Sequence, residues 1–184
     1  MQWENRSAFV YVKTYPGKAQ EVYQQFQKNP QVLACFMMPG NHDLMVWFDS
    51  KNMNDVYNWI AAARNNGQIE QTATYPAYYG YWNGESYQNK KYYGWIKVRS
   101  DAFNAAYDYA CQYDGVSFCA SVTGDYDCFV MVCSDSYDKF HDYQQQFKNR
   151  GYQVEFYVPF QAYWNPKADV YWQQYEKDAC VTAR

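Results

Sequence analysis

Histidine is scarce in this sequence, and closely spaced metal ligands are absent. His42 and His141 are the only histidines among 184 residues, and neither lies in an HxxxH or HxxE spacing. None of the six cysteines belongs to a CxxC pair. Because zinc and related metals are usually held by ligands at such short spacings, the sequence predicts no metal site.

Short catalytic motifs are missing too. No serine lies in a nucleophile elbow, no glycine-rich phosphate loop follows a predicted strand, and no cysteine has a histidine at a fixed motif spacing. These absences do not exclude an enzyme. They favour a non-catalytic protein, and we expect no cofactor.

The chain also lacks a basic excess and a long apolar run. Its net charge is −3 and its pI is near 5.3, so it has too few cations to neutralise phosphates, and we expect no direct nucleic-acid binding. No window approaches the ~18 apolar residues of a membrane span, and the N-terminus does not resemble a signal peptide. We therefore expect a cytoplasmic protein without membrane contact.

Tyrosine, in contrast, is abundant, with 22 residues, and the chain also has seven tryptophans. These side chains combine a large ring with a polar group, so they fill cores and their wet rims and are also favoured at protein interfaces. The sequence leaves both roles open. In the second role, a tyrosine-rich surface would drive self-association or contact with another protein.

The cysteines are expected to be reduced thiols that act as small apolar residues inside strands and helices. Disulfides stay possible, because the sequence cannot assign them. Cys35 and Cys119 recur at equivalent positions and are candidate reactive thiols, but burial among apolar neighbours would raise their pKa and make them inert. The complete set is Cys35, Cys111, Cys119, Cys128, Cys133 and Cys180.

The central feature of the sequence is a turn-and-strand segment that occurs twice, at 40–48 and 124–132. Each copy opens with a glycine, has an aspartate three residues later and continues with five apolar residues, which predicts a tight turn followed by a strand. Both alternating sets of side chains are apolar, so both faces of these strands should be buried. One of the two sets is Met45, Trp47, Phe129 and Met131.

The predicted elements around the first copy are strand, helix, strand, strand, helix, strand. Apolar stripes and breakers place them at 8–15, 18–29, 32–38, 42–49, 50–67 and 69–75. Pro30 stops the first helix, Ser50 caps the second, and Pro76 ends the last strand.

The same order recurs at the offset of 84 residues that separates Gly40 from Gly124, which we interpret as an internal duplication. Pairs that coincide at this offset include Lys13 and Lys97, Cys35 and Cys119, and Val46 and Val130. The sequence thus predicts an α+β fold of two tandem ferredoxin-like (βαββαβ) repeats that form a pseudo-dimeric α/β barrel. The predicted domains are 1–82, a linker at 83–91, a second repeat at 92–165 and a helical tail at 166–184.

Three further residues have specific expectations. Pro159 falls in the last strand of the second repeat, where an edge position would tolerate its missing N–H. His141 falls on the apolar stripe of the last helix, so we expect a core or boundary histidine. His42 lies at the mouth of the first hairpin, where it could carry a proton or bind a metal, but the second copy has Tyr126 there.

Three segments of the first repeat together resemble the effector-binding domain of the Lrp/AsnC family of regulators. They are AFVYVKTYPGK at 8–18, GNHDLMV at 40–46 and IEQTAT at 69–74. The resemblance covers nearly all of 8–75. The second repeat keeps TGDYD at 123–127 but lacks the Pro-Gly pair after its first strand.

The resemblance implies a domain that binds a small molecule, often an amino acid, near the Gly-x-x-Asp turn and that associates through its sheets. The candidate ligand-binding residues are Gly40, His42, Asp43, Gly124, Tyr126 and Asp127. Regulators of the family carry an N-terminal helix-turn-helix, whereas only seven residues precede the first predicted strand, so we expect no direct DNA binding. A plainer role for each aspartate is to accept backbone N–H groups across its turn.

The leading hypothesis is a non-catalytic module that binds an amino-acid-like effector and oligomerises. One alternative is a structural or assembly protein that uses a tyrosine-rich surface. Another is a haem-binding or cofactor-free enzyme of the dimeric α/β-barrel superfamily.

Overall fold

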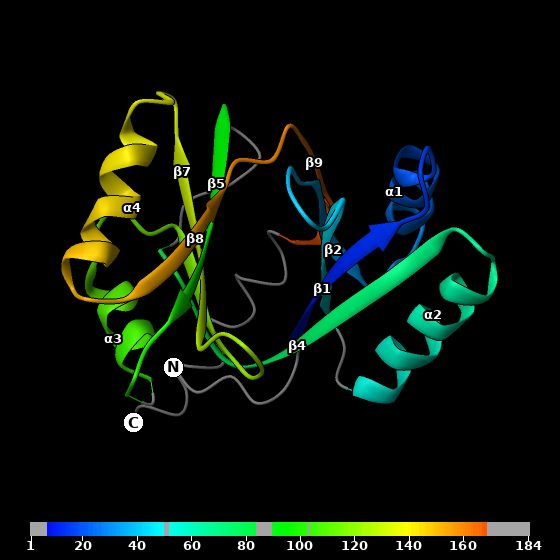
Figure 1. Cartoon of the computed structure of the whole chain (residues 1–184), viewed down its shortest axis with the longest axis horizontal. Coiled ribbons are helices and arrows are strands. Elements are labelled where there is room, and N and C mark those ends of the chain that lie inside the picture. Colours follow the sequence, from blue (N-terminus) through cyan, green and yellow to red (C-terminus); the bar gives the residue numbers. More distant parts are fainter. Residues whose placement is uncertain (1–6, 50–51, 84–89, 103, 169–184) are drawn as a thin grey trace. The chain divides into compact units, whose positions relative to one another are not determined.

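A computed structural model describes residues 7–49, 52–83, 90–102 and 104–168 (Figure 1). Cys180, nearly all of the predicted C-terminal helix and most of the predicted linker lie outside the described residues. Contacts divide the chain into two units. Of the described residues, 7–77 and 159–168 make up the first unit, and 78–158 make up the second unit.

The helices and strands follow the predicted order in both halves of the chain, except that the second half has one more strand than predicted, β9. The first half contains β1 (Ser7–Thr14), α1 (Ala19–Gln27), β2 (Val32–Met37), β3 (Leu44–Asp49), α2 (Met53–Asn65) and β4 (Ile69–Trp82). The second half contains β5 (Tyr92–Arg99), α3 (Ala105–Gln112), β6 (Phe118–Val122), β7 (Cys128–Ser134), α4 (Lys139–Asn149), β8 (Gln153–Tyr157) and β9 (Gln161–Trp164). The predicted α+β class is confirmed, while the duplication stays an interpretation. No helix of the described residues has the length and apolarity needed to cross a membrane.

The first unit is an antiparallel sheet with two helices on one face. Its strands lie in the order β4-β1-β3-β2-β9, and α1 and α2 cover one side (Figure 1). The core between helices and sheet includes Val10, Val46, Phe48, Phe26 and Ile60. Alternate strand residues enter this core because strand side chains point to opposite faces in turn.

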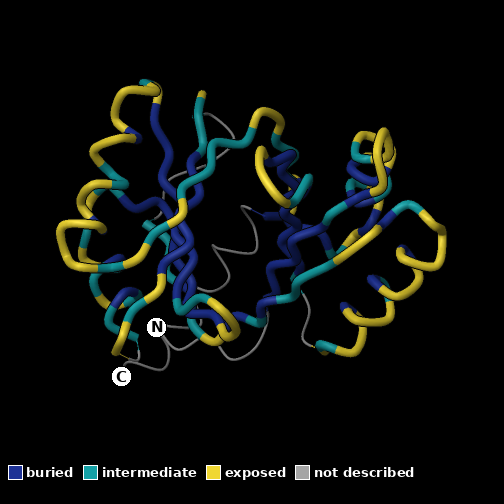
Figure 2. The backbone as a smooth tube through the Cα atoms, in the orientation of Figure 1, coloured by how far each residue is buried: buried dark blue, intermediate teal, exposed yellow. Residues whose placement is uncertain are grey.

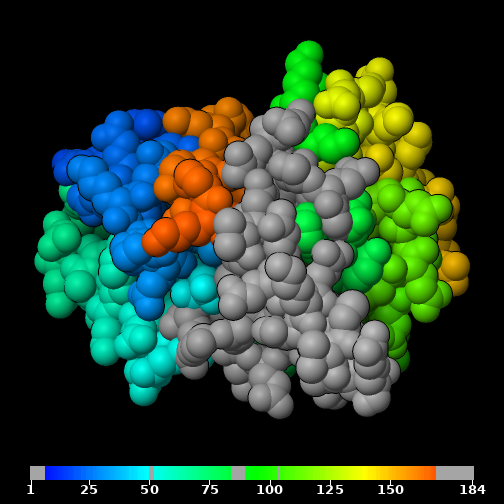
Figure 3. Space-filling model, turned by 180° about the vertical axis from the view of Figure 1, so that it is seen from behind, coloured from blue at the N-terminus to red at the C-terminus, as the bar shows by residue number. Residues whose placement is uncertain are grey.

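Strand β9 joins the first unit from the far end of the chain. It pairs with β2, where Tyr163 lies opposite Cys35, and Trp164 packs edge-to-face on Phe36 with ring centres 5.2 Å apart. The Asn165 N–H donates to the Leu33 carbonyl at 2.8 Å. In Figure 3, residues 159–168 (orange) lie against blue residues of the first unit.

The second unit has the strand order β8-β5-β7-β6, again antiparallel, with α3 and α4 on one face. Its core includes Val98, Val130, Phe140 and Phe147. The strands of each unit are largely buried, while the outer turns of the helices are exposed (Figure 2). Tyrosines close the rim of this second core, namely Tyr81, Tyr92, Tyr107, Tyr109, Tyr113, Tyr143 and Tyr152. Much of the tyrosine excess therefore serves packing.

The strand faces opposite the helices are also buried, as the two-sided apolar pattern predicts. Four large side chains on this face are all 0% exposed. They are Met45, Trp47, Phe129 and Met131.

Two prolines lie elsewhere than predicted. Pro76 does not end a strand but lies inside β4, opposite Ala8 of β1. Proline has no N–H, so Pro76 can contribute only its carbonyl to strand pairing. Pro159, expected within a strand, lies between β8 and β9, where its fixed φ and missing N–H favour a break in pairing.

Two predictions about helices are also corrected. The N-cap of α2 is Asn52, whose side chain accepts the Asn54 N–H at 3.0 Å; the predicted cap, Ser50, lies outside the described residues. His141 is exposed, not in the core. The buried side chains of α4 are Phe140 and Phe147, and a residue next to Phe140 is rotated by about 100° around the helix.

A single offset does not relate the two halves of the chain. Val12 lies opposite Leu44 in the β1–β3 pair, and Val98 lies opposite Cys128 in the β5–β7 pair. Leu44 and Cys128 are 84 residues apart, whereas Val12 and Val98 are 86 apart. The second unit therefore has two fewer residues than the first between its first strand and its hairpin.

This shift corrects one predicted equivalence. Lys97 does not take the place of Lys13. Arg99 occupies the position of Lys13, and Lys97 occupies that of Tyr11. Lys97 consequently points to the face opposite the helices, since its neighbours on β5 contribute to the helix-side core.

We expect Gly94→Ala to destabilise the second unit. A Cβ at Gly94 would lie 2.7 Å from the Phe156 ring and 3.0 Å from Val132, and overpacking of this kind costs about 1–3 kcal/mol. Urea unfolding measures the loss. In the Phe156→Leu background, Gly94→Ala should lower the free energy of unfolding by less, because the ring is gone. An equal loss in both backgrounds would contradict this explanation.

Candidate functional site

The β2–β3 turn of the first unit is fixed to the end of β1. Gly40 has a φ of 104°, which favours glycine because a Cβ would be strained there. The Met38 N–H donates to the Asp43 carbonyl at 2.8 Å, and the Asp43 N–H donates to the Val12 carbonyl at 2.9 Å. These bonds place the Asp43 side chain next to the last residues of β1.

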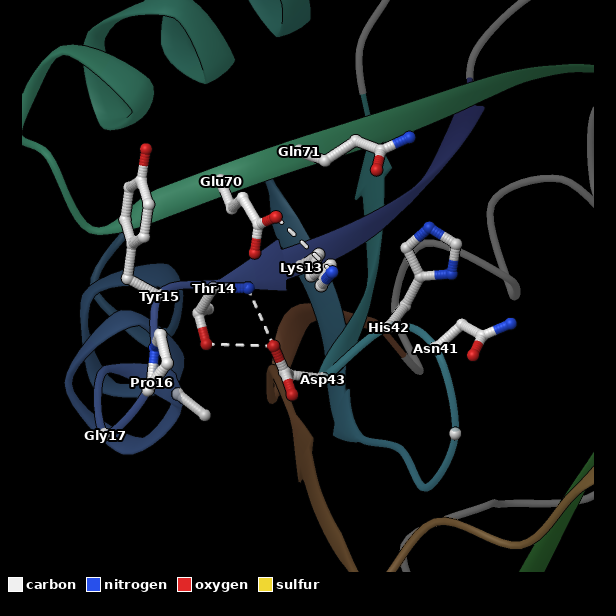
Figure 4. A pocket seen from close by; sticks show the side chains of 12 residues that line it. Lys13, Thr14, Tyr15, Pro16, Gly17, Asn41, His42, Asp43, Glu70 and Gln71 are labelled. Atoms are coloured by element: carbon white, nitrogen blue, oxygen red, sulfur yellow. Dashed lines mark hydrogen bonds and ion pairs between the residues drawn. The ribbon is translucent and has the colours of Figure 1, made fainter.

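The carboxylate of Asp43 binds Thr14, the last residue of β1. Its Oδ2 accepts the Thr14 N–H at 2.7 Å and the Thr14 hydroxyl at 2.9 Å (Figure 4). Within the described part of the chain, Oδ1 of Asp43 accepts no hydrogen bond. Asp43 therefore has a structural role and still has one oxygen available to a ligand.

A cleft of about 770 Å³ opens beside this turn. Its walls come from the end of β1, the turn at 40–43 and the start of β4 (Figure 4). Lys13 Nζ lies 3.4 Å from Glu70 Oε1, and both side chains are nearly half-exposed. His42 also lines the cleft and packs edge-to-face on Tyr11 with ring centres 5.6 Å apart. The cleft thus presents charges of both signs and an imidazole.

The corresponding turn of the second unit has the same backbone arrangement. Gly124 has a φ of 129°. The Val122 N–H donates to the Asp127 carbonyl at 3.0 Å, and the Asp127 N–H donates to the Val98 carbonyl at 2.9 Å. Oδ2 of Asp127 accepts the Ser100 N–H at 2.7 Å, so this carboxylate also binds the residue that follows the first strand.

The cleft beside this second turn is smaller, about 190 Å³. Asp127 lines it, whereas Gly124 and Tyr126 do not. Among the described residues, its walls include no histidine and no aromatic ring. The two turns therefore share their backbone geometry but not their space or their chemistry. The remaining lining residues are Arg99, Ser100, Asp101, Asp125, Gly151 and Gln153.

Tyr126 belongs instead to a cluster around Lys97, which is only 5% exposed. Lys97 Nζ lies 5.1 Å from the ring centre of Tyr126 and 5.0 Å from that of Tyr157. Glu155 Oε2 is 3.8 Å from Nζ, and the hydroxyls of Tyr126 and Tyr157 each donate to Glu155 at 2.7 Å. Two rings and a carboxylate thus compensate the buried ammonium group.

The cluster changes the pKa values of its members. Burial lowers the pKa of Lys97, because it penalises the charged form, and Glu155 opposes this effect. Burial would raise the pKa of Glu155, but hydrogen bonds from both tyrosines and the nearby cations hold that pKa below its usual value. Burial and Glu155 raise the pKa of Tyr157 to about 12. Tyr157 therefore stays protonated and continues to donate.

The structure brings together half of the predicted ligand-binding residues. Gly40, His42 and Asp43 lie around the larger cleft, and Asp127 alone of the second set lines the smaller one. Sequence reasoning did not select Lys13 and Glu70, because their proximity depends on the pairing of β1 with β4 and not on any local spacing.

The Lys97 cluster was also missed, although the sequence carries a signal for it. Lys97 lies between Ile96 and Val98 in a strand whose neighbours are apolar on both faces. A charge in such a strand needs a partner, because an isolated buried charge is very costly. The partner, Glu155, lies opposite Lys97 in the β5–β8 pair.

We expect Asp43→Ala to destabilise the protein more than Asp127→Ala. Removing Asp43 leaves two donors of Thr14 without their acceptor, whereas removing Asp127 leaves only the Ser100 N–H. An unsatisfied buried group costs about 1–3 kcal/mol. Urea unfolding of the two variants gives the comparison, and an equal or larger loss for Asp127→Ala would be inconsistent with it.

We expect the effect of Glu155→Gln to depend on pH. Because the pKa of Glu155 is depressed in the folded state, its carboxylate stabilises the protein above its unfolded pKa of about 4.3 and loses this effect as the pH falls through the folded pKa. Glu155→Gln should therefore lower the urea midpoint at neutral pH, and this difference should shrink as the pH is lowered to about 3. The same difference at both pH values would rule out this role.

Several solved structures share the fold of this chain. The siroheme decarboxylase NirDL has a TM-score of 0.65 at 10% identity, over 94% of this chain and 79% of that chain, and it has also been solved with an iron-uroporphyrin III analogue. A protein assigned as a chlorite dismutase, TA0507, has a TM-score of 0.51 at 10% identity, over 92% of this chain and 99% of that chain. At this identity the likeness shows the fold alone, that of the dimeric α/β-barrel proteins.

Sequence similarity to known proteins is found in the first half of the chain. FFRP-DM1 is 27% identical over 39% of this chain and 97% of that chain, with a TM-score of 0.37. No curated protein matches the chain in sequence. The model of the Lrp/AsnC ligand binding domain matches residues 7–82, which include the turn at 40–43 and every wall of the larger cleft. Residues 7–82 therefore match the Lrp/AsnC ligand binding domain family.

Proposed function

We propose that the cleft beside Asp43 binds a small, amino-acid-like effector and that the chain acts as a non-catalytic ligand-binding module. The observation that carries this proposal is the position of the cleft, which lies entirely within the residues matched by the ligand-binding domain family. A free amino acid carries an ammonium group and a carboxylate. It therefore needs a partner of each sign, and the cleft offers both.

Asp43 and Lys13 are the proposed partners of the effector. Oδ1 of Asp43 is available to accept a charge-assisted hydrogen bond from the ammonium group. Lys13 is paired with Glu70, but exposed ion pairs contribute only about 0–1 kcal/mol, so Lys13 can exchange Glu70 for the effector's carboxylate at little cost. Glu70 would then face the ammonium group as a second acceptor.

The second unit supports no equivalent site among its described residues. Its cleft has about 190 Å³, compared with about 770 Å³ in the first unit. The rings and the carboxylate that could hold a ligand's ammonium group already surround Lys97. We therefore expect one effector site per chain.

The two alternative functions have less support. Of the described tyrosines, only Tyr15, Tyr57, Tyr78 and Tyr137 are exposed. Tyr57 lies in α2, Tyr78 lies in β4, and the other two lie in separate loops, which does not favour a tyrosine-rich assembly surface. The enzyme alternative rests on likeness of fold, and one fold can host many functions. The family match over residues 7–82 does support self-association of the chain, which native mass spectrometry measures directly.

We expect one or more of the standard amino acids to raise the melting temperature of the protein, because a ligand that binds only the folded state stabilises it. Titration calorimetry then gives the affinity. Asp43→Asn and Lys13→Gln should each weaken binding about tenfold or more, which corresponds to the loss of one charge-assisted hydrogen bond. Asparagine keeps an acceptor for Thr14, so this change tests binding more than folding.

Asp127→Asn is the matched control, since it makes the same change at the same place in the second unit. Its affinity should equal that of the parent chain. An equal loss in Asp43→Asn and Asp127→Asn, or no response of the parent chain to any amino acid, would overturn the proposal.

A further inference from the structure

Three cysteines meet in the second unit between α3 and the sheet. Cys111 lies in the last turn of α3, Cys119 lies in β6, and Cys128 begins β7. The Sγ atoms of Cys111 and Cys119 are 3.7 Å apart, and the Cys128 thiol also interacts with Cys119. All three are free thiols. The fold has therefore placed a pair of thiols almost within bonding distance.

The three thiols differ in accessibility and in acidity. Cys119 and Cys128 are fully buried, whereas Cys111 is partly exposed. Hydrogen bonds from Cys119 and from the Tyr107 hydroxyl lower the pKa of Cys111, although burial acts against them. Burial raises the pKa of Cys119. Because the thiolate is the reactive form of cysteine, a dissolved oxidant should react first with Cys111.

We propose that Cys111 and Cys119 form a reversible disulfide when the protein meets a two-electron oxidant such as hydrogen peroxide. In the first step, Sγ of Cys111 attacks one peroxide oxygen, the O–O bond breaks, and the other oxygen leaves as water, which converts Cys111 to a sulfenic acid. In the second step, Sγ of Cys119 attacks Sγ of Cys111, the S–O bond breaks, and a second water leaves with the thiol proton. Two thiols are oxidised and one peroxide is reduced to two waters.

The geometry permits the second step with a small movement. A disulfide bond is about 2.05 Å long, so the two sulfur atoms must approach by about 1.6 Å from their separation of 3.7 Å. Cys111 lies one residue before the end of α3, and Tyr113 after it has an extended backbone. The end of this short helix can therefore adjust without a change in β6. The bond would fasten α3 to the sheet.

The first unit provides an internal comparison. Cys35 lies opposite Val46 just as Cys119 lies opposite Val130, but Gln27, the last residue of α1, takes the place of Cys111. Cys35 is fully buried, and burial raises its pKa. No other described thiol lies within hydrogen-bond distance of it. Cys35 should therefore remain reduced under conditions that oxidise Cys111.

The test uses the full chain with Cys180→Ser, so that the cysteine outside the described residues cannot pair. The protein is treated with hydrogen peroxide, its remaining thiols are blocked with N-ethylmaleimide after unfolding, and it is cleaved on the N-terminal side of aspartate. This cleavage separates Cys111 on 108–113 from Cys119 on 114–124 and from Cys128 on 127–134. Trypsin would leave these cysteines together on 100–139.

The expected product is a linked pair of peptides 108–113 and 114–124, about 2 Da lighter than the sum of the reduced peptides and separated again by dithiothreitol. Cys111→Ser should abolish the link. Cys119→Ser should leave a sulfenic acid on Cys111 that dimedone traps. Cys35 should be fully alkylated after unfolding in every sample. The linked peptides are measured in the Cys180→Ser chain itself. A folding defect in Cys111→Ser or Cys119→Ser therefore does not affect this result.

Two results would overturn the proposal. One is a disulfide that joins Cys128 to either partner in place of the Cys111–Cys119 bond. The other is a Cys111 that stays reduced while Cys35 or Cys133 is oxidised, because that order would show that neither proximity nor access directs the reaction.

Discussion

The aspartate of each Gly-x-x-Asp turn binds the end of a neighbouring strand, and the candidate sites depend on this interaction. Asp43 accepts two hydrogen bonds from Thr14, and Asp127 accepts one from Ser100. A backbone N–H of the same aspartate donates to the first strand of its unit. The turn, the first strand and the strand paired on its other side are thus held together, and the space that remains between them is the cleft.

The two units use this shared frame differently. In the first unit the cleft is large, and Lys13, Glu70 and Asp43 give it charges of both signs. In the second unit a two-residue shift brings a lysine into the position of Tyr11, and Glu155 and two tyrosines compensate its charge inside the protein. The charges of the first unit therefore line an open cleft, whereas the second unit has its cation built into the chain.

The second unit also contains a pair of neighbouring thiols that its small cleft does not include. Its helix α3 carries Cys111 where the first unit has Gln27. The group beside the buried Cys119 is therefore a thiol instead of an amide. Ligand binding in one unit and thiol oxidation in the other would be independent properties of a chain whose halves share an order of elements. The halves differ at individual side chains, and those side chains decide the chemistry.

The sequence by itself determined the order of helices and strands from β1 to β8, the two turns with their glycines, and the burial of both strand faces, because these follow from local periodicity and turn chemistry. It also pointed to Gly40, His42 and Asp43, which lie in one local segment. Only the tertiary structure decided that Pro76 lies inside a strand, that Arg99 replaces Lys13, and that Lys97 meets Glu155. These features depend on strand register and on contacts between distant segments, and a shift of two residues leaves the apolar pattern unchanged.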